Sequence, residues 1–296
     1  DCSSRGLGDV YKRQKIYEKN ATYGSSSLGE RKKVQIEFVS ANPTGPLHVG
    51  HGRGAAYGDA LSRILKSTGY KVEKEYYVND AGRQIDILTA SVIMRMLKKE
   101  LNGFFPQNAY KGEYIESIIE KFGEKIKFDE ANNLIKNLSS DAEDEINEII
   151  TSLKMKDLMI WNKVKDHSLA FIVDLIKEDL KNFNVSFDNW FYESSLGSVE
   201  EQNSEISSSI AQLSKDGMGY EKDGAIWLNT EICDDDKHRV LVRKDGRATY
   251  FASDVAYHKN KIDRGFDKLI NVWGADHHGY IKRIEASVEA LSLIHI

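Results

Sequence analysis

The chain has 296 residues, of which 41% are hydrophobic and 29% charged, and its formal net charge is −5. This composition is typical of a folded globular protein and argues against wholesale disorder. The mild acidity gives no support to a nucleic-acid partner, although a local basic face would not alter it much. With only Cys2 and Cys233, neither a disulfide framework nor a four-cysteine zinc site is available. No apolar run approaches the roughly 20 residues that cross a bilayer, and no secretory signal is recognisable, so we expect a cytoplasmic protein.

The two ends of the chain differ from the rest. Residues 1–14 show no sustained period of two or of 3.6, and residues 292–296 follow a helical pattern without a stop signal. We interpret residues 1–14 as a foreign or disordered tail and residues 292–296 as a foreign tail, with ordinary frayed termini as the alternative. Residues 15–33 would then be the end of an N-terminal domain and a linker, followed by one large domain over residues 34–291.

The first elements of this domain form a strand–helix–strand unit. Residues 34–39 alternate as a strand with Glu37 on the polar side, and residues 40–46 form a Gly/Pro loop. A helix is expected from about His48 to Ser67, ended by Thr68-Gly69, and a second strand over residues 70–78. The predicted packing side of this helix consists of Ala55, Ala56, Leu61, Ile64 and Leu65. Short connections of this kind predict a parallel sheet with a right-handed crossover.

The remaining elements predict an insertion and a return to the sheet. Residues from about 85 to 185 are mostly helical by periodicity, and residues 187–192 are extended. Asp223-Gly224 and Asp245-Gly246 are hairpin turn signals within residues 220–228 and 240–250. A last strand is expected at residues 268–273 and a last helix at residues 280–291.

The strand–helix junction at residues 40–51 carries the strongest chemical signal. Its two histidines, His48 and His51, would lie on one face of a helix N-terminus, where backbone N–H groups and the helix dipole favour an anion. Nearby glycines allow a bulky ligand to approach the backbone: Gly45, Gly50, Gly52 and Gly54. This arrangement suits the binding of a polyphosphate while charge builds up in transfer at phosphorus.

Two other interpretations of these histidines stay open. A zinc site could use His48, His51, His277 and His278, although glycines beside the first pair suit a ligand better than a metal cage. Two surface histidines at a helix start are the commoner case, but this interpretation leaves the glycines unexplained.

Several ordered stretches resemble one enzyme family. Residues 46–51 resemble the HIGH signature of class I aminoacyl-tRNA synthetases, and residues 37–51 resemble arginyl-tRNA synthetases of bacterial type. Further stretches agree with that family: residues 79–84, 190–196, 249–254 and 273–280. The resemblance implies an α/β fold, a Rossmann-like parallel-sheet catalytic domain over residues 34–291 with the helical insertion at about 85–185. It also implies activation of L-arginine with ATP to arginyl-adenylate, followed by transfer to tRNA(Arg).

The resemblance also implies an ATP site. His48 and His51 would be catalytic, contacting the ATP phosphates and stabilising the transition state at the α-phosphate. Adenine would stack against Gly50, while Asp276 is either a ribose-hydroxyl acceptor or the N-cap of the following helix. The expected ATP-binding residues are Gly45, His48, Gly50, His51, Gly274 and Asp276. Mg²⁺ is expected to accompany ATP, and no structural metal is expected.

Selection of arginine needs its own pocket. A guanidinium presents five donors in a planar fork and stays charged, so it calls for carboxylates placed for paired hydrogen bonds. The family resemblance assigns Glu37 and Asp254 to the guanidinium, and Asn42, Tyr250 and His277 to the rest of the arginine site. We expect Glu37 and Asp254 to face one cavity with His48 at its other end. Without the family, they are simply a polar-face strand residue and a first-turn helix acid.

One departure from the family pattern limits the expected activity. The sequence contains no Lys-Met-Ser-Lys stretch, the second signature of the family, and no counterpart of its anticodon-binding domain. We therefore expect a truncated ligase, weakly active or inactive alone and monomeric, with arginine and tRNA(Arg) as partners. The alternatives are a cytidylyltransferase-like nucleotidyl transferase and a synthetase-derived binding module without catalysis.

Overall fold

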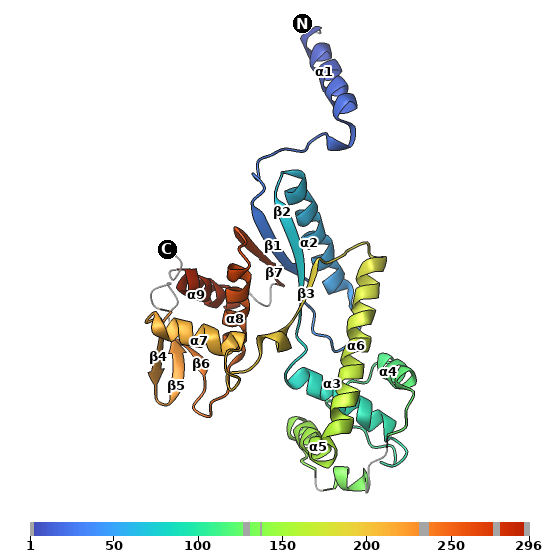
Figure 1. Cartoon of the computed structure of the whole chain (residues 1–296). Helices are drawn as coiled ribbons and strands as arrows, with labels where there is room; N and C mark the ends of the chain where they lie inside the picture. Colours follow the sequence, from blue (N-terminus) through green and yellow to red (C-terminus); the bar gives the residue numbers. More distant parts are fainter. Residues whose placement is uncertain (1–2, 127–130, 137, 231–236, 275–278, 293–296) are drawn as a thin grey trace.

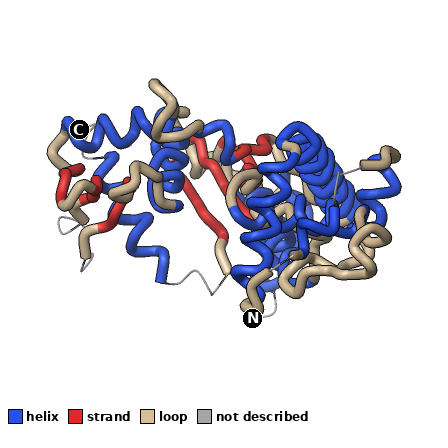
Figure 2. Tube along the Cα trace, turned by 90° about the horizontal axis from the view of Figure 1, so that it is seen from below, coloured by secondary structure: helices blue, strands red, loops and turns tan. Residues whose placement is uncertain are grey.

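A computed structural model describes residues 3–126, 131–136, 138–230, 237–274 and 279–292. A parallel sheet stands at the centre, with a helical region on one side and a smaller mixed unit on the other (Figure 1). The same three-part arrangement is visible from below, where the strands run between the two groups of helices (Figure 2). Within the described residues, no helix is both long and apolar enough to span a membrane.

The central sheet confirms the predicted parallel architecture. Its strands are β1 (Lys33–Phe38), β2 (Lys71–Val78), β3 (Asn189–Tyr192) and β7 (Lys268–Val272), in the order β3-β2-β1-β7. All three pairings are parallel, with Gln35 of β1 opposite Glu73 of β2 and Leu269 of β7. The chain builds outward from β1 to β2 and β3, and later adds β7 on the other side. The β1/β7 boundary is therefore the switch point, where open α/β sheets bind ligands at the carboxyl ends of their strands.

Helix α2 (Val49–Ser67) covers one face of this sheet and corrects one prediction. Its buried residues are Ala55, Gly58, Asp59 and Ser62. Of the predicted packing side, Ala56 is exposed and Ile64 is 60% exposed. A Cβ on Gly58 would lie 2.2 Å from Cγ of Phe38, so the absence of a side chain lets the helix lie directly on β1. Ala55 is buried, and Leu61 and Leu65 pack partly buried against the core, so three of the five predicted residues are confirmed and small residues such as Gly58 join them on the packing face.

Strand β1 is buried on both faces. Val34, Ile36 and Phe38 lie on the apolar side, while on the other side Gln35 donates to Glu75 and Glu37 accepts from Lys261 of α8 (Tyr250–Asp263). Glu37 is only 7% exposed. The alternation seen in the sequence therefore separates an apolar layer from a buried polar layer, not a core from solvent.

The predicted helical insertion is confirmed between β2 and β3. It contains α3 (Arg83–Met96), α4 (Tyr114–Phe122), the 3₁₀ turn η2 (Ala131–Ile135), α5 (Ala142–Lys156) and α6 (Leu158–Asn182). Its buried side chains belong to the same apolar core as the sheet. The insertion thus extends the main domain rather than forming a separate core.

The smaller unit has its own core and antiparallel sheet. It contains η3 (Glu193–Leu196), α7 (Glu205–Lys215), β4 (Gly219–Lys222), β5 (Ala225–Leu228), β6 (Arg239–Val242), α8 and α9 (Ile281–Ser292). The Asp223-Gly224 hairpin is confirmed, with both residues at positive φ. The second turn also forms, but its return strand is a single bridge from Val242 to Ala248. The chain turns helical there because the side chain of Thr249 caps α8 by accepting from the Ala252 N–H.

The N-terminal helix α1 (Ser3–Lys19) stands apart from the body, followed by the 3₁₀ turn η1 (Asn20–Thr22) (Figure 1). It runs through the predicted boundary between residues 14 and 15, and its side chains from residue 8 onward are exposed. The described part of the first fourteen residues is helical rather than disordered. Their foreign origin stays a prediction.

Candidate functional site

The loop after β1 is held in an uncommon backbone conformation. Val39 and Ser40 have φ values of 68° and 39°, in the left-handed region that is unfavourable for a β-branched residue such as valine. Ser40 Oγ donates to Glu37 Oε1 at 3.1 Å and accepts from the Tyr77 N–H at 3.1 Å. Tyr76 Oη donates to the Ala41 carbonyl at 3.0 Å. These contacts fix the turn that leads from the strand to α2.

The two histidines cap α2. His48 is the N-cap residue, and its Nδ1 accepts from the Gly50 N–H at 3.1 Å. His51 Nδ1 accepts from the His48 N–H at 3.2 Å, and the two rings stack with centroids 3.7 Å apart. Burial, and then the charge of His48, lower the pKa of His51. Because each Nδ1 accepts, the neutral rings carry their hydrogens on Nε2, where they are available to donate to an anion.

A cavity of about 910 Å³ lies at the switch point between β1 and β7; we call it the β1–β7 cavity. Its lining includes, from the predicted ATP site, His48, Gly50, His51 and Gly274, together with Gly54 and Arg53. Arg53 was missed by sequence reasoning, although it lies within the His-Gly-Arg-Gly run, where a cation beside a polyphosphate would be expected. Gly45 is not among the lining residues; a Cβ there would meet the Tyr114 ring at 3.2 Å. Asp276 lies outside the described residues.

The zinc interpretation gains no support from the described part of the chain, where no group of three or more candidate metal ligands occurs. His277 and His278 lie outside it. The Nδ1 atoms of His48 and His51 are already used as acceptors for backbone N–H groups. The pair is built as a helix cap with outward donors.

A second cavity of about 380 Å³ lies beside the first, and Trp273 lines both. Three carboxylates face it: Glu37, Glu193 and Asp254. Four tyrosines complete much of the wall: Tyr77, Tyr250, Tyr257 and Tyr280. The predicted convergence of Glu37 and Asp254 is therefore confirmed, whereas His48 lies in the neighbouring cavity rather than at the far end of this one. We call it the carboxylate cavity.

Burial controls the protonation of two of its acids. It raises the pKa of Asp254 to about 7, assisted by the negative charges of Glu193 and Glu37 and opposed by a hydrogen bond from Tyr280. Burial also raises the pKa of Glu193, against a hydrogen bond from Tyr77. These two acids therefore bind protons more readily than free carboxylates do, and a cation in the cavity would oppose that protonation.

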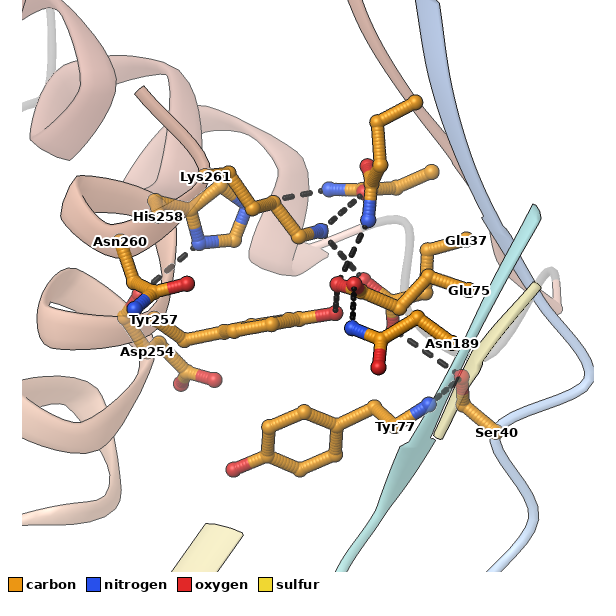
Figure 3. A network of polar contacts seen from close by, with 12 residues as sticks. Glu37, Ser40, Glu75, Tyr77, Asn189, Asp254, Tyr257, His258, Asn260 and Lys261 are labelled. Atoms are coloured by element: carbon orange, nitrogen blue, oxygen red, sulfur yellow. Dashed lines mark hydrogen bonds and ion pairs between the residues drawn. The ribbon is translucent and has the colours of Figure 1, made fainter. Parts of the chain in front are cut away.

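Glu37 already has a cationic partner inside the protein. Lys261 of α8 is fully buried, and its Nζ donates to Glu37 Oε2 at 2.6 Å (Figure 3). The same Nζ donates to Asn271 Oδ1 at 2.9 Å. The same ammonium lies 4.1 Å from the centroid of the Tyr257 ring. His258 is held by the Asp254 carbonyl and by Asn271, and burial lowers its pKa to about 4. Neither Lys261 nor these contacts were anticipated from the sequence.

A second buried carboxylate, Glu75, accepts a hydrogen bond from Tyr257 of the cavity wall. Burial raises the pKa of Glu75, but hydrogen bonds from Arg264, Tyr257 and Asn189 outweigh it and leave the pKa below its usual value. The Tyr257 hydroxyl donates to Glu75 Oε1 at 2.7 Å, and Asn189 Nδ2 donates to Glu75 Oε2 at 2.6 Å (Figure 3). Tyr257 is thus fixed between the sheet and the cavity that its ring lines.

The other predicted arginine contacts divide between the cavities. Asn42 lines the β1–β7 cavity, whereas Tyr250 lines the carboxylate cavity and is 66% exposed. His277 lies outside the described residues. Sequence reasoning missed Glu193, although it lies in the stretch 190–196 that carried the family resemblance. Its placement at the end of β3 was the available signal.

A parallel sheet with a cavity at its switch point and a helix that begins beside it defines a Rossmann-like α/β domain. The family described as "tRNA synthetases class I (R), catalytic domain" matches residues 13–293. The chain belongs to this family of class I tRNA synthetases.

Individual relatives agree. An arginine–tRNA ligase of Vesicomyosocius okutanii is 45% identical over 286 residues, covering 94% of this chain and 49% of the relative. One from Legionella pneumophila strain Philadelphia 1 is 47% identical, covering 93% of this chain and 48% of the relative. The chain thus spans about half the length of the curated relatives it matches. A Campylobacter jejuni structure assigned as an arginyl-tRNA synthetase superposes with a TM-score of 0.72 at 34% identity, over 94% of this chain and 55% of that one.

Proposed function

We propose that this chain carries the amino-acid-activating site of an arginine–tRNA ligase. The β1–β7 cavity would take ATP, and the carboxylate cavity would take the side chain of L-arginine. One carboxylate oxygen of arginine attacks the α-phosphorus of ATP, forming arginyl-adenylate and releasing pyrophosphate. The arginyl group then passes to a ribose hydroxyl of tRNA(Arg), and AMP leaves.

The convergence of Glu37, Glu193 and Asp254 on one cavity is the observation that carries this proposal. An uncompensated buried carboxylate costs several kcal/mol, so three acids in one cavity call for cations. Lys261 supplies one positive charge behind Glu37. A ligand guanidinium supplies a second, and a proton retained on Glu193 brings the site to neutrality. The raised pKa of Glu193 fits that last role.

The phosphate side depends on donors rather than on a built metal site. His48 and His51 present Nε2–H groups and Arg53 a guanidinium to the β1–β7 cavity. Their hydrogen bonds would strengthen as negative charge grows on the α-phosphate. None of its described lining residues is a carboxylate. Mg²⁺ accompanying ATP would therefore be held by phosphate oxygens and water, supplying further positive charge.

Titration calorimetry on the 296-residue chain tests the proposal. We expect L-arginine to bind, with citrulline, its neutral isostere, and lysine each weaker by on the order of 10⁴-fold, because a site built around hydrogen bonds rejects ligands that leave them unmade. ATP should bind and CTP should not. Equal binding of arginine and citrulline would remove the guanidinium site, and preference for CTP would favour a cytidylyltransferase-like enzyme.

The same proposal includes the chain's partners and setting. We propose a monomer that acts in the cytoplasm on L-arginine and tRNA(Arg). Light scattering at micromolar concentration should give the mass of one chain. Arginine binding without any adenylate formation or tRNA binding would instead favour a binding module derived from a synthetase.

A further inference from the structure

We propose that Lys261 is a positioning residue, which holds the Glu37 carboxylate aimed into the carboxylate cavity without contacting the ligand itself. The inference rests on the proposed function, since it concerns how the guanidinium acceptor is prepared. It assigns a role in ligand selection to a residue that lies outside both cavities.

The location of Lys261 separates it from the ligand. Its side chain is fully buried, and it is not among the residues that line the carboxylate cavity, whereas Glu37 and Tyr257 are. The ammonium therefore contacts Glu37 from the protein interior rather than from the cavity. Taking a lysine ammonium out of water costs several kcal/mol, so such a residue needs full compensation by its surroundings.

That compensation is complete in this structure. An ammonium has three donors, and Lys261 Nζ uses one on Glu37 Oε2 at 2.6 Å and another on Asn271 Oδ1 at 2.9 Å. Its charge also faces the Tyr257 ring at 4.1 Å. Asn271 is itself oriented, because its Nδ2 lies 3.0 Å from Nε2 of His258. Three elements of the fold thus hold the ammonium in one place.

The geometry at Glu37 points to preorganisation. Lys261 occupies Oε2 and the Ser40 hydroxyl occupies Oε1, so both oxygens are gripped from the protein side. Each carboxylate oxygen has two lone-pair sites, and the remaining pair can accept the two parallel N–H groups of a guanidinium. Without the ammonium, this carboxylate would be an uncompensated charge in a mostly buried position and would turn away from the cavity. That change removes the bidentate acceptor.

The chain offers a matched control for the loss of a buried ion pair. Lys74 of β2 is also buried, and its Nζ donates to Asp59 at 3.0 Å and to Ser186 at 3.3 Å. None of these residues lines either cavity. Lys261→Met and Lys74→Met should therefore both lower the melting temperature, while only a positioning role for Lys261 makes them differ in arginine binding.

Calorimetry with L-arginine on four variants tests the proposal, with melting curves to establish that each is folded. We expect Lys261→Met to weaken arginine binding at least tenfold and Lys74→Met to change it less than twofold. In the Glu37→Gln background, adding Lys261→Met should cost less than twofold, because the carboxylate it prepares is gone. The double variant carries no buried unpaired charge, so it reports on the coupling even if Lys261→Met alone does not fold.

The outcomes separate this proposal from the function on which it rests. If the wild-type chain binds no arginine, the proposed function fails and the positioning role fails with it. If arginine binds and Glu37→Gln weakens it, but Lys261→Met binds like the wild type, only the positioning role is overturned. Equal, additive losses from Lys261→Met in both backgrounds would likewise overturn it.

Discussion

The two neighbouring cavities are built in opposite ways. The β1–β7 cavity takes its histidines from one short stretch, residues 40–51, and those rings are held by hydrogen bonds within that stretch. The carboxylate cavity gathers Glu37, Glu193 and Asp254 from β1, η3 and α8, and burial raises the pKa of Glu193 and of Asp254. Donors aimed at the phosphates act mainly on charge that develops during a reaction, whereas acids that bind a guanidinium act mainly on ground-state affinity. Substitutions in the β1–β7 cavity should therefore lower mainly the reaction rate, and substitutions in the carboxylate cavity mainly the affinity for arginine.

The largest effect is expected from the histidines. In a full-length form carrying this sequence, His48→Ala or His51→Ala should slow arginine-dependent ATP–pyrophosphate exchange by roughly a hundredfold or more, because each ring donates to growing phosphate charge. Arginine binding, measured by calorimetry, should change less than threefold. Exchange at the wild-type rate in both variants would remove the phosphate-binding role of this cavity.

In the carboxylate cavity, Asp254→Asn should weaken the binding of arginine roughly a hundredfold, since it removes one member of a desolvated, charged, hydrogen-bonded pair. ATP affinity should stay nearly unchanged. Asp263→Asn, at the exposed end of the same helix, is the matched control and should leave arginine binding as it is. Loss of ATP and arginine binding together would mean that the two cavities do not act separately.

The protonation of Asp254 gives a smaller, graded effect. Since burial raises its pKa to about 7, protons compete with a cationic ligand below that pH. Arginine affinity should be level above pH 8 and fall towards tenfold per pH unit below pH 6, with proton release detected in calorimetry buffers of different ionisation enthalpy. Asp254→Asn should flatten this profile, and a wild-type profile that is flat from pH 5.5 to 8 would contradict the assignment.

The same group affects stability with the opposite sign. A folded-state pKa of about 7, above the usual value of 3.8, means that the native chain binds the proton more tightly than the unfolded chain. Its contribution to stability is then complete below about pH 4 and is lost as the pH rises through 7. The melting temperature of the unliganded Asp254→Asn variant should accordingly depend less on pH over this range than that of the wild type.

The smallest effect concerns the packing of α2 on β1, beside the β1–β7 cavity. Gly58→Ala would place a Cβ against Phe38, so we expect a loss of about 1–3 kcal/mol in the free energy of unfolding, measured in urea. Gly52→Ala, in the same helix with no atom within 4 Å of the new Cβ, should instead gain up to about 1 kcal/mol. A stabilised Gly58→Ala variant would show that α2 does not need its close approach to β1.

The sequence predicted the local features of this molecule better than the distant ones. The β1–α2–β2 unit, the insertion and the Asp223-Gly224 turn follow from periodicity and turn chemistry over short spans. Ala55, Leu61 and Leu65 of the packing face of α2 were found in this way, but the place of Gly58 in it was not, because its close fit on Phe38 depends on a neighbouring strand rather than on hydrophobicity.

The same limit applies to the site. His48 and His51 are evident from their spacing and glycines, and Glu37 and Asp254 came from the family resemblance. Lys261 resembles any helix lysine in the sequence, since its burial beside Glu37 exists only after α8 packs on the sheet. Glu193 is equally ordinary until β3 brings it to the same edge as Glu37.

The position of β7 beside β1 has a consequence for how the chain is made. Lys261 lies 224 residues beyond Glu37, and β7 follows it, so a ribosome adding about 5–20 residues per second completes this part roughly 11–45 s after β1. Until then, β1 has an open edge that could pair with other nascent chains. Glu37 stays exposed to water throughout that interval, because α8, which carries its buried partner Lys261, has not yet been made. The carboxylate at the centre of the finished site can thus serve as a gatekeeper against aggregation while the domain is still incomplete.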